Sequence, residues 1–191
     1  MIPKIEIYYS DIYQAFIRDL QKKGFAGYEA RKKSGWKFAK NLSTKTKFLL
    51  PKALKAYENV SGLKWKDPLI EVFVVHGIKW AFSLPVTINI VRDYWNATET
   101  LLHELSHQII LQNEGKFKWK NKISQKYKKE HFVVREHILP HAILWKAYEK
   151  LFGARKLKNI IKGYTRWKWH YRAWQIVKEE GANNIIKTYV K

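Results

Sequence analysis

The sequence predicts an α+β fold in which a small β-sheet lies between a helical N-terminal part and a helical C-terminal region. Apolar residues recur at helical spacing in the first 62 residues, and the β-branched run at 69–75 is typical of a buried strand. Helical patterns then resume and continue to the end of the chain. We expect one domain over residues 1–191, divided into a helical part (1–62), a core (69–152) and a basic aromatic tail (154–191).

Three helices are expected in the N-terminal part. In the first, at 8–23, Ile12, Phe16 and Leu20 follow the i, i+4, i+8 pattern and Gly24 is the stop signal. The second helix, at 28–41, is weakened by a glycine at position 35. The third, at 44–60, contains a proline at position 51 that kinks or restarts it.

The expected sheet comes next in the chain. Residues 69–75 form a buried strand, and residues 79–84 could pair with it as a hairpin. Residues 86–91 alternate with period two, which indicates a half-buried strand.

Helices dominate the rest of the chain. The first should begin at Asn96, with Glu99 completing a capping box, and should end near Gly115. The apolar segment 130–152 predicts a helix that Gly153 ends and that Pro140 kinks or begins. A further helical pattern is then expected at 171–180, and a short apolar stretch follows at 182–190.

The composition excludes several kinds of chemistry. The chain has no cysteine, so disulfides, cysteine-based zinc ribbons and thiol catalysis are ruled out. The N-terminus carries Glu6 and Asp11 and lacks the apolar core of a signal peptide, and no apolar run approaches 18 residues. These features predict a cytoplasmic protein without a membrane span.

The net charge of +21 has two readings. It could attract a polyanion, and the segments 116–129 and 155–172, in which basic and aromatic residues are interleaved, then become candidates for single-stranded nucleic acid. It could equally reflect a lysine-rich composition, as in a thermophile or an A/T-rich genome, with these segments simply solvated.

One motif carries specific chemistry. His103-Glu104-Leu105-Ser106-His107 has the H-E-x-x-H pattern, which places two imidazoles on one face of a helix where they can bind Zn²⁺. Glu104 is the expected general base, which takes a proton from a water at the metal and returns it to the leaving amine. The alternative is an ordinary helix with two polar histidines.

A catalytic zinc site needs a third protein ligand. The metzincin extension is excluded, because Ile110 and Asn113 stand where it requires glycine and histidine. The apolar helix 130–152 instead offers three ligand-type side chains, which are His137, His141 and Glu136.

With these residues, positions 69–152 resemble the gluzincin clan of zincin-type metallopeptidases, in which a second helix supplies a glutamate ligand and an acidic residue four positions later supports a motif histidine. The resemblance implies that His137 lies at the ligand position and His141 at the supporting position, so histidine replaces the clan's glutamate. The other register would put Glu136 and Pro140 there, and proline could not form the supporting hydrogen bond.

The expected function is therefore zinc-dependent hydrolysis of peptide bonds in a protein or peptide substrate. Tyr164, His170 and Tyr171 are candidates for stabilising the oxyanion, and His76 is expected to be structural. One alternative resembles the SprT-like proteases, which act on nucleic-acid-bound proteins. The other is a basic nucleic-acid-binding protein without enzymatic activity.

Overall fold

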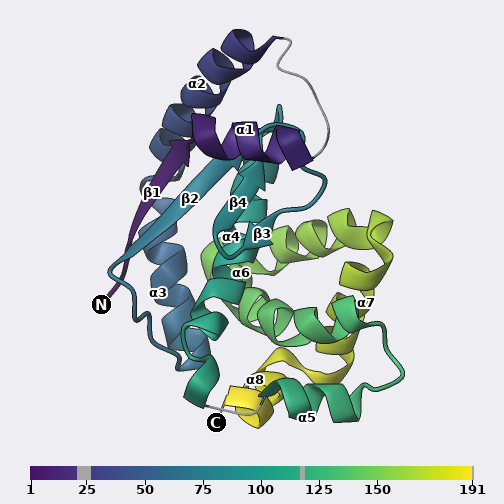
Figure 1. The fold of residues 1–191 in the computed structure, drawn as a ribbon. Helices are drawn as coiled ribbons and strands as arrows, with labels where there is room; N and C mark the ends of the chain where they lie inside the picture. The colour runs from purple at the N-terminus through teal and green to yellow at the C-terminus, as the bar shows by residue number, and fades with distance from the viewer. Residues whose placement is uncertain (21–26, 117–118, 191) are drawn as a thin grey trace. The chain divides into compact units, whose positions relative to one another are not determined.

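The computed structural model describes residues 1–20, 27–116 and 119–190, and it confirms the α+β class (Figure 1). The chain divides into two compact units. The first contains Met1–Pro51 and Asp67–Gln108, and the second contains Lys52–Lys66 and Ile109–Lys191. The single-domain organisation stays a prediction.

The first unit holds a four-stranded mixed sheet in the order β1-β2-β4-β3. Its strands are β1 (Lys4–Tyr9), β2 (Leu69–Val75), β3 (Phe82–Ser83) and β4 (Val86–Asn89). β2 pairs in parallel with β1 and with β4, whereas β3 pairs antiparallel with β4. The predicted hairpin between 69–75 and 79–84 is therefore wrong, because β4 takes the place next to β2 and leaves β3 at the edge.

Strand β1 replaces the start of the predicted helix at 8–23. It pairs with β2 from Lys4↔Leu69 to Tyr9↔Val74, so its partner lies more than 60 residues away in the chain. The helix α1 begins only at Asp11 and runs to Leu20; Lys23 and Gly24, the predicted end and stop, lie outside the described residues.

Helix α1 presents its apolar stripe to solvent. Ile12, Phe16 and Leu20 are all exposed, whereas Gln14 is fully buried. The Gln14 amide accepts a hydrogen bond from the backbone N–H of His76 (2.6 Å) and donates one to the His76 carbonyl (3.2 Å). The inward side of α1 carries Gln14 together with Ile17, which packs with Val75 and Ile78. The sequence pattern thus predicted the helix but not the side that faces inward.

Helix α2 (Tyr28–Thr46) extends beyond the predicted 28–41 and passes through Gly35 without interruption. A Cβ built on Gly35 would lie 2.2 Å from Cδ2 of Tyr9, which is only 1% exposed. The glycine that lowers helix propensity is therefore the residue that lets α2 approach β1 closely.

Helix α4 (Tyr94–Leu111) carries the H-E-x-x-H motif and starts two residues before the predicted cap. Asp93 caps it, because its Oδ1 accepts a hydrogen bond from the N–H of Trp95 at 2.9 Å. The predicted capping box at Asn96 and Glu99 is wrong, since both lie inside the helix. Gly115 does not cap its C-terminus either, because it belongs to the 3₁₀ turn η1 (Glu114–Lys116).

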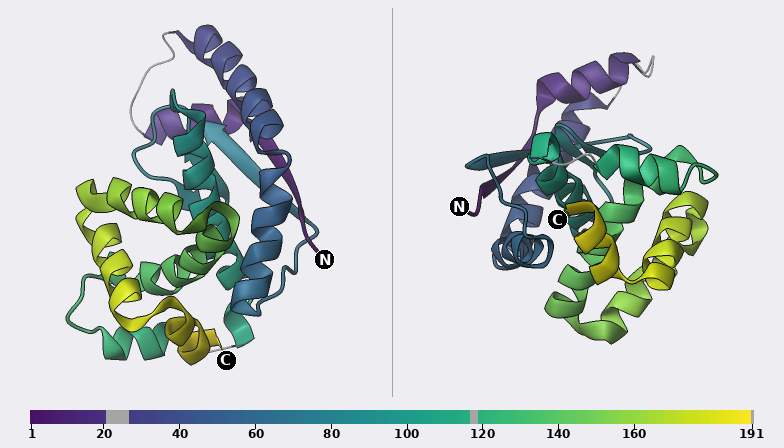
Figure 2. Two further views of the ribbon diagram at one scale, coloured as in Figure 1. Left: turned by 180° about the vertical axis from the view of Figure 1, so that it is seen from behind. Right: turned by 90° about the horizontal axis from the view of Figure 1, so that it is seen from below.

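The second unit is helical in its described residues. It contains most of α3 (Leu49–Ser61), then α5 (Trp119–Lys126), α6 (Phe132–Gly163), the 3₁₀ turn η2 (Tyr164–Arg166), α7 (Lys168–Glu180) and α8 (Ala182–Val190). Helices α7 and α8 both pack against α6 (Figure 2).

Two predicted helix breakers behave differently. The backbone of α6 leaves helical geometry at Gly153 (φ 78°, ψ 163°), as predicted, and a second helical stretch follows. At Pro140 the backbone stays helical, so the helix does not begin there; the proline is buried on the apolar side of α6. In α3, Pro51 lies in the first turn, where its missing N–H needs no partner, so the helix restarts there as predicted.

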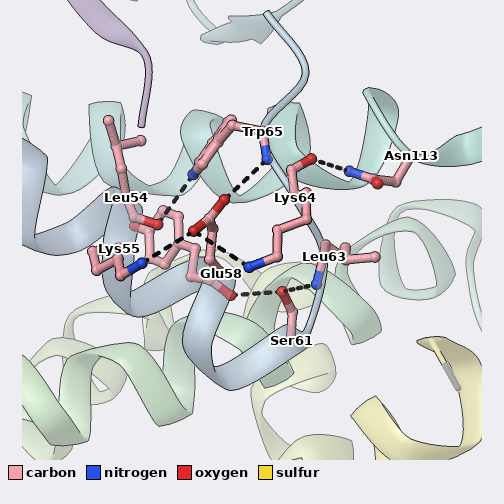
Figure 3. Close-up of polar contacts among 9 residues, drawn as sticks. Leu54, Lys55, Glu58, Ser61, Leu63, Lys64, Trp65 and Asn113 are labelled. Atoms are coloured by element: carbon pink, nitrogen blue, oxygen red, sulfur yellow. Dashed lines mark hydrogen bonds and ion pairs between the residues drawn. The ribbon is translucent and has the colours of Figure 1, made fainter. Parts of the chain in front are cut away.

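A buried carboxylate ties the segment after α3 to that helix (Figure 3). Glu58, 4% exposed, accepts a hydrogen bond from the N–H of Trp65 (3.4 Å) and faces the ammonium groups of Lys55 (3.6 Å) and Lys64 (3.7 Å). The Trp65 indole donates to the carbonyl of Leu54 at 3.1 Å. The charge of Glu58 is thus compensated, which burial of a carboxylate requires.

No helix in the described ranges has the length and apolarity needed to cross a membrane.

Candidate metal site

The two motif histidines converge in the first unit. Both lie on α4, one turn apart, and their Nε2 atoms are separated by 3.3 Å. Their ring centroids are 5.0 Å apart with the planes tilted by 53°. His103 is buried, and His107 is partly exposed.

This spacing fits a tetrahedral zinc ion. Two nitrogens bound at about 2.05 Å with a tetrahedral angle between them stand about 3.3 Å apart. The observed distance between the two nitrogens is therefore compatible with a shared metal ion. It also suits an N–H···N hydrogen bond between the rings, and metal analysis separates the two readings.

Glu104 lies between the two histidines in sequence and is 7% exposed. Burial raises its pKa to about 7, and a hydrogen bond from Ser83 Oγ (2.5 Å) opposes this rise. The carbonyl of Ser83 also accepts a hydrogen bond from the Gln108 side chain. Two side chains of α4 thus bind the edge strand β3, and one of these contacts holds the carboxyl group that the motif predicts as the base.

The second unit gathers its own histidine cluster, which contains His137, His141 and His170. His137 lies on α6 with His170, from α7, beside it at 4.1 Å between ring centroids, and the ligand nitrogens of these two residues lie within 4.8 Å of each other. His141 follows one turn after His137, with its centroid 5.4 Å away. Two helices therefore bring together imidazoles that are 33 residues apart in the chain.

The orientation of His137 suits a metal ligand. Its Nδ1 donates a hydrogen bond to the carbonyl of Val133 at 2.6 Å, which places the proton on Nδ1 and the lone pair on Nε2. A histidine that binds a metal through one ring nitrogen usually donates a hydrogen bond from the other ring nitrogen. Burial lowers the pKa of His170 to about 4, so that ring is neutral at pH 7.

The other predicted residues have varied surroundings. His141 is fully buried and stacks on Trp174 at 4.2 Å, and Tyr164 lies 5.8 Å from His141 and 6.0 Å from His170. Of the three oxyanion candidates, His170 thus belongs to the histidine cluster and Tyr164 lies beside it. Tyr171 is half-buried in the first turn of α7, and Glu136 is exposed on α6.

Two histidines have structural contacts instead. His76 Nε2 lies 3.0 Å from the carbonyl of Arg31 and 3.1 Å from Ser34 Oγ. His131 caps α6 through its Nδ1, which accepts from the N–H of Val133 at 3.3 Å, and it stacks on Trp169. The surroundings of His76 agree with its interpretation from the sequence as structural.

Two features of the site were missed by the sequence interpretation. Ser83 contacts Glu104 only because β3 folds back beside α4, and a lone serine in a short strand carries no signal. His170 was considered for the oxyanion and not as a ligand, because its neighbour His137 lies on another helix. Only the packing of α7 on α6 makes the two adjacent.

Comparison with known proteins gives no relative: no family model, no curated protein and no solved structure matches this chain.

Proposed function

We propose that this protein is a zinc-dependent metallopeptidase that hydrolyses peptide bonds, with its zinc held by His103 and His107 and with Glu104 as general base and acid. The observation that carries the proposal is the 3.3 Å separation of the two Nε2 atoms on α4. The motif helix thus already presents two ligands at the separation that tetrahedral zinc requires.

The third ligand is proposed from the sequence pattern. His137 comes first, because its Nδ1 is held by a backbone carbonyl and its Nε2 carries the lone pair. His141 is the second choice, because its ring is stacked on Trp174. Glu136, which is exposed on α6, is the third.

A bound Zn²⁺ supplies Lewis-acid chemistry, which polarises a carbonyl and lowers the pKa of a water. The carboxylate of Glu104 accepts the proton of the attacking water and delivers it to the leaving amine. Ser83 Oγ, donating to Glu104 Oε2, holds that carboxylate in one orientation.

The edge of the sheet offers a place for a peptide substrate. β3 is the last strand in the order β1-β2-β4-β3, and an extended peptide can add to such an edge through its main chain. Trp80, Phe82 and Leu84 are exposed in and beside this strand and supply apolar surface for substrate side chains. The same strand contacts Glu104 through Ser83, so a peptide added there would lie near the proposed base.

Metal content is the first test. The purified full-length chain should contain about one zinc per molecule when measured by inductively coupled plasma mass spectrometry. His103→Ala and His107→Ala should each lose most of it, while His131→Ala, which removes a histidine that caps α6, should keep it. Equal zinc content in all four proteins would remove the motif from the metal site. The variants His137→Ala, His141→Ala and Glu136→Gln then rank the third-ligand candidates.

Activity is the second test. Glu104→Gln keeps the size of the side chain and removes the base, so it should bind zinc like the wild type and lose roughly 10²–10⁴-fold in peptide hydrolysis. Cleavage of unfolded casein, followed by mass spectrometry, provides the assay. Undiminished cleavage by the Glu104→Gln variant would contradict the assigned role. Zinc binding without hydrolysis in the wild type would leave a metal-binding protein and remove the peptidase.

Two further expectations remain proposals. A cytoplasmic location is tested by cell fractionation. Action on nucleic-acid-bound proteins, as in the SprT-like class, depends on whether the chain binds nucleic acid.

A further inference from the structure

The positive charge is distributed very unevenly between the two units. The first unit has 13 lysines and arginines against 9 acidic residues, a net charge of +4. The second has 24 against 7, a net charge of +17. The attraction of this protein for a polyanion must therefore come mainly from the second unit, because charges of opposite sign largely cancel in the first.

Within the second unit, the longest stretch without acidic residues follows Glu149. Between Glu149 and Glu179 the chain carries nine lysines and arginines and neither aspartate nor glutamate. It folds as the end of α6, the turn η2 and most of α7. Arg155, Lys158 and Lys162 recur at i, i+3 and i+7 on α6, so they share one side of the helix, and all three are exposed. Arg166, in the turn η2 that follows α6, is exposed as well.

The other basic segment, 116–129, is compensated to a greater degree, although residues 117–118 lie outside the described part. Lys120 pairs with Glu114, and Lys126 pairs with Glu180. Tyr127 donates a hydrogen bond to the same Glu180 at 2.6 Å. These lysines and Tyr127 therefore stabilise the fold through contacts with acidic side chains. The end of α6 is the better binding surface.

An aromatic ring lies next to the row of cations. Trp167 follows Arg166 directly, is 38% exposed, and has the Arg166 guanidinium over its ring at 5.6 Å. Among the described residues of the second unit, only Phe132 and Trp167 are large hydrophobic side chains with high exposure. This surface thus has cations and one ring for a stacked base, but little apolar area to insert into a lipid layer.

We propose that Arg155, Lys158, Lys162, Arg166 and Trp167 form a basic face that binds single-stranded nucleic acid. The four cations contact successive phosphates of the backbone, and a base stacks on the Trp167 indole. Binding of this kind is independent of sequence and depends strongly on salt concentration. The basic face shares no residue with the proposed zinc ligands, so nucleic-acid binding can be tested whether or not the chain hydrolyses peptides.

The experiment compares two variants that remove equal charge. Arg155→Gln/Lys158→Gln/Lys162→Gln changes the basic face, and Lys33→Gln/Lys37→Gln/Lys40→Gln removes three exposed lysines from one side of α2 in the first unit. Both lower the net charge from +21 to +18. Binding of a fluorescein-labelled oligothymidine of about 20 nucleotides is measured by fluorescence anisotropy between about 0.05 and 0.3 M salt, a range over which the screening length changes markedly.

The basic-face variant should bind roughly 50-fold more weakly at about 0.15 M salt, with the slope of log K against log salt reduced by about 2, because three phosphate contacts are lost. The α2 variant should remain close to the wild type. Equal losses in both variants would show that only overall charge matters and would overturn the proposal. Circular dichroism checks that both variants are folded, as the exposure of all six side chains leads us to expect.

The role of Trp167 is tested separately. Trp167→Ala should weaken binding roughly tenfold without changing the salt slope, since stacking releases no counterions, and Trp167→Phe should restore most of the affinity. An unchanged affinity in Trp167→Ala, or equally tight binding of a duplex of the same length, would remove the preference for single strands. Binding to vesicles containing phosphatidylserine in phosphatidylcholine, without binding to the oligonucleotide, would replace nucleic acid by an anionic lipid surface and overturn the proposal.

Discussion

The contact between α2 and β1 makes a prediction that the structure quantifies. In Gly35→Ala the new Cβ would lie 2.2 Å from Cδ2, 2.4 Å from Cε2 and 2.6 Å from Cγ of Tyr9. The Tyr9 ring cannot easily move away, because it is buried with edge contacts to Trp36 and His76, both at 6.2 Å between centroids. The overlap must therefore be relieved by shifting α2 or the strand itself.

The magnitude follows from two opposing terms. Overpacking a tight core costs about 1–3 kcal/mol, and an overlap with a ring held on several sides belongs near the upper end. Alanine in a helix regains about 1 kcal/mol relative to glycine. We expect Gly35→Ala to lose about 2 kcal/mol of unfolding free energy, which lowers Tm by roughly 4–8 °C in a chain of this length.

Gly163→Ala is the matched control. Gly163 has helical dihedrals (φ −60°, ψ −26°), and a Cβ built on it would meet nothing within 4 Å. That variant should gain about 0.5–1 kcal/mol from helix propensity alone. Both are measured by thermal melting and by urea unfolding, followed by circular dichroism. A Tm for Gly35→Ala equal to or above that of the wild type would refute the assigned close contact. Replacing Tyr9 by leucine should reduce the loss, because the ring that causes the overlap is gone.

Three further predictions concern the helix cap, an acidic residue and the metal. Asp93→Ala should lose about 1 kcal/mol because it removes the cap of α4, whereas Asn96→Ala, inside the helix, should be neutral or slightly stabilising in the same urea titration. Although burial raises the pKa of Glu180, hydrogen bonds from Lys126 and Tyr127 outweigh it, and the pKa is lowered. Glu180 therefore stabilises the folded state at pH values above its pKa in the unfolded chain, and this contribution is lost as the pH falls through its pKa in the folded protein. The stability of Glu180→Gln should fall less steeply than that of the wild type between about pH 5 and pH 3. Identical pH profiles of the two proteins would contradict this. If the chain binds zinc, free zinc at about 100 times its Kd should stabilise the fold by about 2.7 kcal/mol, and a chelator should reverse the rise in Tm; a Tm that ignores both would count against the metal.

Local patterns predicted the elements whose formation depends on their own residues. The β-branched run at 69–75 forms β2 with those bounds, and the motif helix, the break at Gly153 and the helix expected at 171–180 are also present. In each case hydrophobic periodicity or backbone geometry is a property of consecutive residues. The separation of His103 and His107 belongs here too, since helical spacing alone places them on one face.

Contacts between distant segments decided the rest. Residues 4–9 form strand β1 because they pair with β2. The ring of Tyr9 on that strand fits against helix α2 because Gly35 has no side chain. The stripe of Ile12, Phe16 and Leu20 on α1 faces solvent, because Gln14, bound to His76, and Ile17, packed on Val75 and Ile78, occupy the inward side. None of these partners is near in sequence, so no window of consecutive residues contains the information.

The candidate site divides in the same way. The sequence by itself determined the helix that bears His103, Glu104 and His107, because their spacing is a consequence of the helical repeat. Only the tertiary structure decided that Ser83 holds the Glu104 carboxyl and that His170 lies beside His137. The physical reason is that hydrogen bonds and ring contacts between separate elements depend on how strands and helices pack, and that packing is set by the burial of many side chains at once.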